Sequence, residues 1–287
     1  MKNGMTHPVM MRMVSMLIFL LVAEAHALAA DFPQGLMLHF SFDQWEGGGV
    51  VTDKTGRGNN GRAFGAKWTA LGKQAGGFDF TATNNYIQVN HSPTLSLTQA
   101  TFAVWFKTVK SDAISRYIFE KSSNHGFALS VAGDARGIQN RGKLRFSING
   151  HECLSDQAVT DVFWHHAAAV FDGKSLKLFV DGHMQQQVTD WKGGVVANTN
   201  DLSIGLNRSS PAPEEKGVSF EGTLDEFMVF NHALSEVEIT TVIAAAKPKY
   251  TKEQVRKRLA ELKELLDRGL ILPDFYTRKV KECEVTE

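Results

Sequence analysis

The sequence has few cysteines and no excess of basic or acidic residues. The first absence argues against a disulfide-stabilised fold, and the second argues against nucleic-acid binding. Only Cys153 and Cys283 occur among 287 residues. Two cysteines do not build a disulfide framework, and we expect both thiols to be free. The 31 basic residues balance 31 acidic ones, and residues 31–246 carry 18 basic and 22 acidic side chains. Nucleic-acid-binding proteins usually show a basic patch or stripe, so we expect no nucleic-acid partner.

Common catalytic and metal-binding motifs are also missing. The chain contains neither His-Glu-x-x-His nor the Gly-x-Ser-x-Gly of a nucleophile elbow. His165 and His166 are adjacent, and neighbouring residues of a strand point to opposite faces. The two imidazoles therefore cannot hold one metal ion without a bulge. We expect His166 to be a core residue with hydrogen-bonded ring nitrogens.

The hydrophobic run near the N-terminus is too short to cross a membrane comfortably. It extends from Met13 to Ala23 after Lys2 and Arg12, and Ala27-Leu28-Ala29 has the small-residue spacing of a signal-peptidase site. We predict a signal peptide over residues 1–30, cleaved near Ala29. The protein is then expected to be secreted, or to lie in the periplasm or cell envelope.

What the sequence does contain is a series of short strands separated by glycine-rich turns. Residues 164–182 predict a β-hairpin around Asp172-Gly173-Lys174-Ser175, and both faces of its first strand are mostly apolar. A strand covered on both sides fits a two-sheet sandwich. Similar runs from Leu36 to Phe230 predict roughly 12 to 14 strands, and Ser235-x-x-Glu238 predicts the capping box of a helix that ends near Ile243.

Seven of these stretches, in order, resemble the laminin-G-like jellyroll of the concanavalin A-like lectin/glucanase superfamily. They are GLMLHFSFD, DKTGRGNNG, FDF…YIQV, TFAVWFK, WHHAAAVFDGKSLKLFVDG, LSIG and FEGTLDEFMVFNHALSEVEI. The resemblance implies an all-β fold, a two-sheet antiparallel jellyroll sandwich, over residues 31–246. Residues 247–287 differ in composition and predict a short helical hairpin that turns at Gly269 and restarts at Pro273. This tail is similar to the short C-terminal hairpin called SHOCT, and we expect it to support self-association.

The resemblance also implies a structural calcium ion where the first and last strands meet near a polar loop. Calcium binds carboxylate, amide and carbonyl oxygens. On this basis the candidate ligands are Asp43, Asp53, Asn60 and Asp225. The alternative is that these side chains only form Asx turns and cap strand ends.

An enzymatic function is not expected. Glucanases of this superfamily carry Glu-x-Asp-x-Glu on one strand, where alternation places all three carboxylates on one face. That spacing is absent here, and the adjacent Asp225 and Glu226 are expected to face opposite ways.

Aromatic side chains beside loops could stack on sugars, but the pattern does not single one out. Trp45, Trp68, Tyr86, Tyr117 and Trp191 lie in or beside loops, whereas Trp105 and Trp164 sit in alternating strands and are expected in the core. We predict a secreted, non-catalytic recognition module that binds a glycan or a cell-surface protein. Two alternatives stay open: an envelope or adhesion scaffold without a small ligand, and a polysaccharide-active hydrolase.

Overall fold

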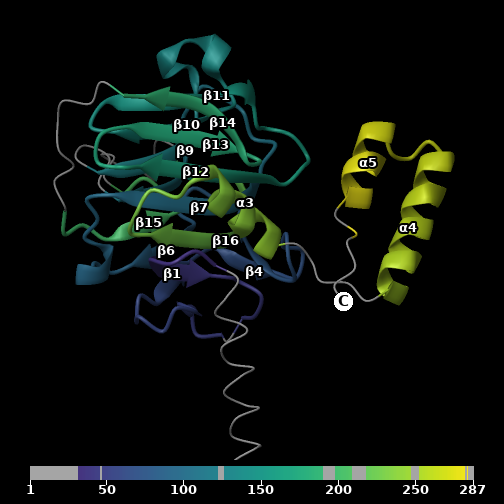
Figure 1. Cartoon of the computed structure of the whole chain (residues 1–287), viewed down its shortest axis with the longest axis horizontal. Helices are drawn as coiled ribbons and strands as arrows, with labels where there is room; N and C mark the ends of the chain where they lie inside the picture. The colour runs from purple at the N-terminus through teal and green to yellow at the C-terminus, as the bar shows by residue number, and fades with distance from the viewer. Residues whose placement is uncertain are drawn as a thin grey trace, which may run out of the picture.

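The computed structural model describes residues 32–45, 47–121, 126–189, 198–208, 218–246, 252–281 and 283. These residues form a sandwich of two antiparallel sheets followed by helices (Figure 1). The predicted signal peptide and Trp191 lie outside the described residues. No helix in the described part of the chain is long and apolar enough to span a membrane.

Sheet A contains eight strands in the order β14-β13-β12-β7-β16-β5-β4, with β1 paired to β16. Its strands are β1 (Leu36–Phe40), β4 (Lys67–Thr69), β5 (Gly77–Phe80), β7 (Ala100–Lys107), β12 (His165–Phe171), β13 (Leu176–Val180), β14 (His183–Val188) and β16 (Gly222–Phe230).

Sheet B also contains eight strands, in the order β11-β10-β9-β8-β15-β6-β3-β2. Its strands are β2 (Val50–Val51), β3 (Gly61–Phe64), β6 (Tyr86–Val89), β8 (Arg116–Lys121), β9 (Phe127–Val131), β10 (Lys143–Ile148), β11 (His151–Ala158) and β15 (Leu202–Ile204). Three short 3-10 turns, Pro93–Leu95, Asp134–Arg136 and Ile138–Asn140, lie in the connections.

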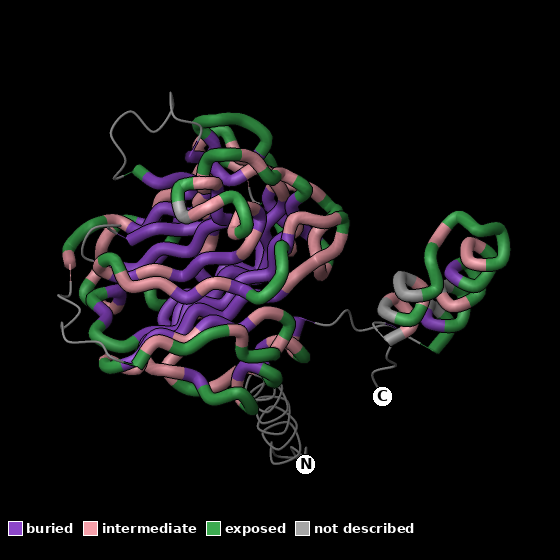
Figure 2. Tube along the Cα trace, turned by 90° about the horizontal axis from the view of Figure 1, so that it is seen from above, coloured by how far each residue is buried: buried purple, intermediate pink, exposed green. Residues whose placement is uncertain are grey.

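The predicted hairpin of residues 164–182 is confirmed as β12 and β13, which pair from Ala167↔Val180 to Phe171↔Leu176. β12 is covered on both faces, as its sequence predicted. Ala167, Ala169 and Phe171 belong to the core between the sheets, and Ala168 and Val170 belong to a second cluster on the outer face of sheet A. The main core is rich in fully buried phenylalanines, and buried strands fill the centre of the molecule (Figure 2).

Helix α3 (Glu236–Ala245) covers part of the outer face of sheet A. Ser235 accepts a hydrogen bond from the backbone N–H of Glu238, whose side chain bonds back to Ser235, so the predicted capping box is confirmed. Ile239 and Val242 of α3 pack in the outer cluster with Ala103 and Met228. One half of this outer face is therefore apolar and covered by a helix.

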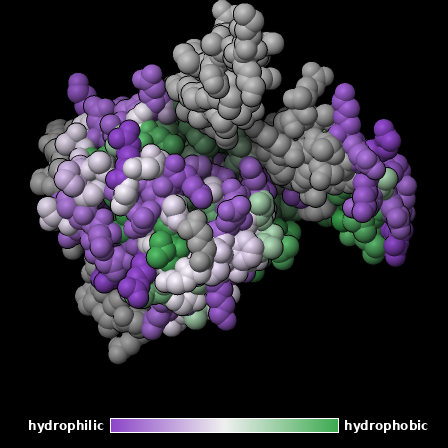
Figure 3. Space-filling model, turned by 90° about the horizontal axis from the view of Figure 1, so that it is seen from below, coloured by the Kyte–Doolittle hydropathy of each residue, from purple (hydrophilic) through white to green (hydrophobic). Residues whose placement is uncertain are grey.

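The C-terminal helices form a separate hairpin, drawn to one side of the sandwich (Figure 1). Helix α4 (Lys252–Asp267) ends before Gly269, which has φ +67°, and α5 (Pro273–Lys281) begins at the predicted proline. Val255, Leu262 and Cys283 form a small buried cluster between the two helices. Hydrophobic and hydrophilic residues lie on different sides of this hairpin (Figure 3).

Both cysteines are free, as predicted, and both are buried. The strand number is higher than the sequence predicted, because sixteen strands occur among the described residues. The missed strands include β11 and β14, which lie at the edges of their sheets and have mostly exposed or half-buried residues. Polar edge strands lack the apolar alternation on which the prediction relied.

Gly205 offers a test of how tightly the two sheets pack. It has φ +90°, and a Cβ there would lie 2.3 Å from the Phe80 ring, whereas Gly150 has φ +84° and open space around its Cα. We expect Gly205→Ala to lower the free energy of unfolding by about 2–4 kcal/mol, from backbone strain plus overpacking. Gly150→Ala carries only the backbone strain, about 1–2 kcal/mol. Urea unfolding measures both, and equal losses would contradict the tight packing at Phe80.

Candidate functional site

The last strand of the sandwich is interrupted by a β-bulge at Asp225 and Glu226. Leu224 and Phe227 both belong to the core between the sheets, although residues three apart on a regular strand face opposite ways. The register of β16 against β7 shifts between Asp225 and Met228, and Glu226 has φ +49°. The expectation that Asp225 and Glu226 face opposite sides is therefore wrong, because the bulge turns both toward the outer face.

A cluster of buried carboxylates surrounds this bulge. Asp225 is fully buried and accepts hydrogen bonds from the backbone N–H groups of Gln74 and Glu226. Burial raises the pKa of Asp225 to about 8, and the nearby charges of Glu226 and Asp43 add to the shift. Burial also raises the pKa of Glu226, although its carboxylate bonds to His39 Nε2 at 2.7 Å.

Glycines allow the loop before β5 to cover Asp225. A Cβ at Gly72 would lie 2.9 Å from Asp225 Oδ2, and one at Gly76 would lie 2.4 Å from the carbonyl oxygen of Phe42. Asp43 Oδ1 and Gln74 Oε1 are buried without a hydrogen-bond partner among the described residues. The cluster thus combines raised carboxyl pKa values with unused oxygen acceptors.

Asp53 and Asn60 lie in a different arrangement. The Asp53 carboxylate accepts hydrogen bonds from the backbone N–H groups of His39, Thr55 and Asn59, and Asn60 Oδ1 accepts one from the Asp53 N–H. Such a pattern holds the loop after β2 in place. The four predicted calcium ligands fall into two groups: the charge of Asp43 helps to raise the pKa of Asp225, whereas Asp53 and Asn60 are joined by a hydrogen bond.

The fit of a calcium ion differs between these two pairs. No group of three or more His, Cys, Asp or Glu side chains in the described residues is arranged to hold a metal ion. Calcium also takes amide and backbone oxygens, up to about six to eight in total. Asp43 and Gln74 offer unpartnered oxygens for that purpose, whereas the Asp53 carboxylate is already used by its own loop. The calcium site stays a prediction, and the Asp43–Asp225 side fits it better.

The surroundings of His165 and His166 indicate that both residues support the fold. Burial lowers the pKa of His166 to about 4, so the ring is neutral at physiological pH. It contacts Trp105, with ring centroids 5.2 Å apart. His166 is a buried residue as predicted, but both ring nitrogens lack a hydrogen-bond partner among the described residues, contrary to the expectation. His165 bonds to Asp181 at 2.8 Å.

A polar row crosses the open half of the outer face of sheet A. Lys107 of β7 pairs with Thr223 of β16, which in turn pairs with Asp79 of β5. The Thr223 hydroxyl donates to Asp79 Oδ1 at 2.6 Å. On the other side of Lys107, its ammonium group lies 5.2 Å from the centre of the Trp164 ring. The row thus presents an aromatic ring, a cation, a hydroxyl and a carboxylate in sequence.

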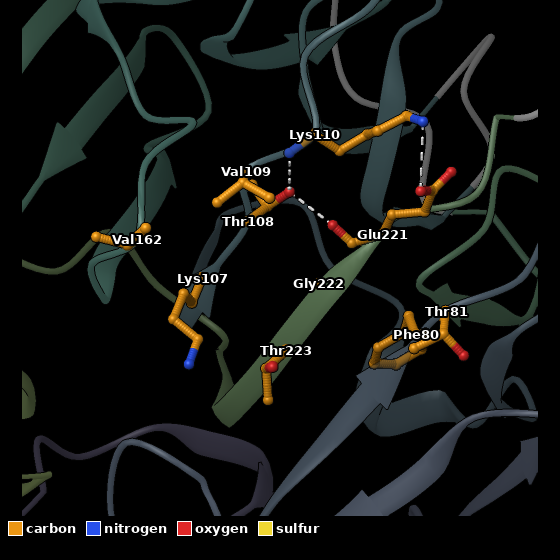
Figure 4. Close-up of a pocket in the computed structure, with 10 residues that line it drawn as sticks. All are labelled: Phe80, Thr81, Lys107, Thr108, Val109, Lys110, Val162, Glu221, Gly222 and Thr223. Carbon is orange, nitrogen blue, oxygen red and sulfur yellow. Dashed lines mark hydrogen bonds and ion pairs between the residues drawn. The ribbon is translucent and has the colours of Figure 1, made fainter.

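An open pocket of about 470 Å³ lies at the end of this row. Figure 4 shows Lys107 and Thr223 at one end and Lys110 and Glu221 at the other. Val109 and Val162 form apolar walls, and their side chains are largely exposed, at 68% and 67%. Binding sites for small ligands are typically concave, mostly apolar and equipped with a few placed polar groups. We call this the outer-face pocket.

The sequence did not identify the outer-face pocket. Lys107 and Thr223 are separated by more than a hundred residues and meet only through the pairing of β7 with β16. Trp164 was expected in the core, yet it is half-buried and contacts Lys107. A signal was available at Lys107, a charged residue that ends the mostly apolar strand β7.

Comparisons with known proteins agree with the fold. Domain 4 of AbnA, an extracellular arabinanase from Geobacillus stearothermophilus, was solved with arabinotriose; it has a TM-score of 0.56 and 19% identity, over 72% of this chain and 97% of that chain. The binding domain of botulinum neurotoxin serotype D has a TM-score of 0.55 and 14% identity, over 74% of this chain and 51% of that chain. The binding domain of botulinum neurotoxin DC, solved with SialylT, has a TM-score of 0.55 and 10% identity, over 76% of this chain and 52% of that chain.

This chain therefore spans about half of the toxin binding domains, and at these identities the likeness shows the fold alone. A search of curated proteins finds no match. The family model described as the concanavalin A-like lectin/glucanases superfamily matches residues 81–240, more than half of the chain, and leaves the helical tail outside. The likeness of the tail to SHOCT stays a prediction. On its sequence and its two-sheet sandwich, this protein belongs to the concanavalin A-like lectin/glucanase superfamily.

Proposed function

We propose that the protein is a secreted, non-catalytic recognition module that binds a glycan through the outer-face pocket. The observation that carries the proposal is the pocket itself, which Lys107 and Thr223 line together with the exposed valines Val109 and Val162. Sugars combine apolar ring faces with many hydroxyl groups, so they suit such a surface. Two proteins of similar fold were solved in complex with arabinotriose and SialylT.

The surroundings of the carboxylates favour binding over hydrolysis. Glycoside hydrolysis needs two carboxyl groups on either side of the scissile bond. Asp225 and Glu226 are only 0% and 5% exposed, so a polysaccharide chain does not reach them. At the pocket, Glu221 is held in ion pairs with Arg116 and Lys110.

A structural calcium ion at the bulge would complete this module. The Asp43 side of the predicted site supplies unpartnered oxygens, and calcium would offset the repulsion among Asp43, Asp225 and Glu226. Asp53 and Asn60 would then support the ion only indirectly, because they hold the loop after β2 that bonds to the His39 backbone.

The helical hairpin is proposed to mediate self-association. Leu270 and Leu272, in the turn between α4 and α5, are 58% and 75% exposed. Among the described residues, three buried side chains form its internal cluster, Val255, Leu262 and Cys283. A core this small stabilises an isolated hairpin weakly, so association with a second copy would add buried apolar area.

A glycan array tests the proposed pocket. Val162→Glu places a charged side chain at the pocket wall, and we expect it to weaken glycan binding at least tenfold because it obstructs the concave surface. Val237→Glu is the matched control, since Val237 is similarly exposed, at 76%, but lies on α3. Loss of binding in both variants, or in neither, would contradict the placement. A protein that binds no glycan at all would favour the scaffold alternative.

Calcium is tested by thermal unfolding at two pH values. The folded-state pKa of Asp225, about 8, lies above its ordinary value, so without calcium the stability from this group is lost as pH rises from about 4 toward 8. Calcium binds the ionised carboxylate, and its stabilising effect should be larger at pH 8 than at pH 5. At a hundredfold excess over Kd, linkage gives about 2.7 kcal/mol, or a rise in Tm of roughly 5–10 °C.

Two variants locate the calcium ion. Asp43→Asn should abolish the rise in Tm, because it removes a charge beside Asp225. Asp53→Asn should lower the Tm through lost loop hydrogen bonds but keep the calcium-dependent rise. The opposite result would place the ion in the loop between Asp53 and Asn60, and no rise in the unmodified protein would remove calcium from the proposal.

Sedimentation tests the tail. The full chain should form a larger species than a chain ending at residue 246, after α3, because the hairpin contributes the association surface. Leu270→Ser combined with Leu272→Ser should shift the full chain toward the smaller species. Sedimentation of all three proteins at the masses of their own monomers would refute self-association through the hairpin.

A further inference from the structure

The two lysines of the outer-face pocket differ in their electrostatic surroundings. Lys110 lies 3.6 Å from a Glu221 oxygen and 3.8 Å from an Asp112 oxygen. Lys107 forms no ion pair with any described residue, and its ammonium group lies over the Trp164 ring. The positive charge at the Lys110 end is therefore compensated, while the charge at the Lys107 end is open to a ligand.

The position of Lys107 strengthens the attraction between its uncompensated charge and an anionic ligand. The side chain is half-buried beside the apolar wall formed by Val162, where a partly desolvated cation gains more from an anion than it would in bulk water. The contact with Trp164 restrains the flexible stem, which lowers the conformational entropy lost on binding. Lys107 thus provides a restrained positive charge at the point where the pocket meets the polar row.

Next along the row come groups that suit sugar hydroxyls rather than a second anion. The Thr223 hydroxyl already donates to Asp79 Oδ1, so both side chains have oxygen atoms left that accept hydrogen bonds. A neutral hydroxyl group can donate to these acceptors, whereas a carboxylate cannot. The row can therefore bind one anionic group of a ligand at Lys107 and hydroxyl groups of the same ligand at Thr223 and Asp79.

We propose that the outer-face pocket selects glycans whose sugars carry a carboxylate, with that carboxylate at Lys107 and neighbouring hydroxyl groups at Thr223 and Asp79. This inference rests on the proposed function and adds the class of ligand. Uronic acids and sialic acids share the required chemistry, a six-membered ring that bears one carboxylate among hydroxyl groups. The apolar side of the sugar ring packs against Val162 and the exposed part of Trp164.

Calorimetric titration of the full chain at about 0.15 M salt tests the inference with matched ligands. Polygalacturonate is compared with its methyl ester, which removes the charge and keeps the sugar, and sialyllactose is compared with lactose. We expect an acidic ligand to bind at least tenfold more tightly than its neutral counterpart. Lys107→Gln should remove that difference, and the arm that shows it identifies the source of the carboxylate.

Lys174→Gln is the control, because it makes the same change in charge at an exposed turn at the opposite end of the β7–β12 pairing. Equal binding of acidic and neutral ligands, or an equal loss in both lysine variants, would overturn the inference. Neutral glycans that bind in a manner sensitive to Val162→Glu would leave the proposed function standing in that case. Failure of all four ligands to bind would overturn the inference about acidic sugars, and the glycan array would then decide the proposed function separately.

Discussion

The pairing of β16 with three other strands is the constraint on which the rest of the molecule depends. β16 hydrogen-bonds to β1, β7 and β5, and thereby joins the first strand of the sandwich to its centre. Both the pocket and the cluster of buried carboxylates contain residues of this strand. Thr223 lies at its start beside the pocket, the bulge with Asp225 follows, and Met228 and Phe230 lie under helix α3.

The outer face of sheet A is divided because side chains alternate along its strands. Toward the end of β16 the outward residues are apolar, and α3 removes them from water. Toward its start they are Thr223 and Asp225, which cannot be covered by an apolar helix without losing hydrogen bonds. A polar loop containing Gln74 covers Asp225, whereas Thr223, itself only 8% exposed, is one of the residues that line the open pocket. One part of this sheet face therefore stabilises the fold by packing against α3, and the other part is available for the proposed ligand.

Polar groups in this region are unusually poorly satisfied. Trp105 Nε1, His166, Gln74 Oε1 and Asp43 Oδ1 are buried without hydrogen-bond partners among the described residues. Buried polar atoms without partners destabilise a protein by about 1–3 kcal/mol each, so they are usually paired with a ligand, an ion or water. Their concentration around Trp105 and Asp225 distinguishes this half of the sheet from the rest of the core.

The amino-acid sequence was enough to predict the class of fold, the hairpin at residues 164–182, the capping box of α3 and the helical tail. Each depends on local periodicity, glycine turns or caps, which act between near neighbours in the chain. Three placements appear only in the folded chain: Asp225 and Glu226 share a face, Asp53 serves its own loop, and Lys107 and Thr223 line one pocket, with Trp164 beside Lys107. Those placements depend on a bulge and on strand register between distant segments, and periodicity within one strand specifies neither.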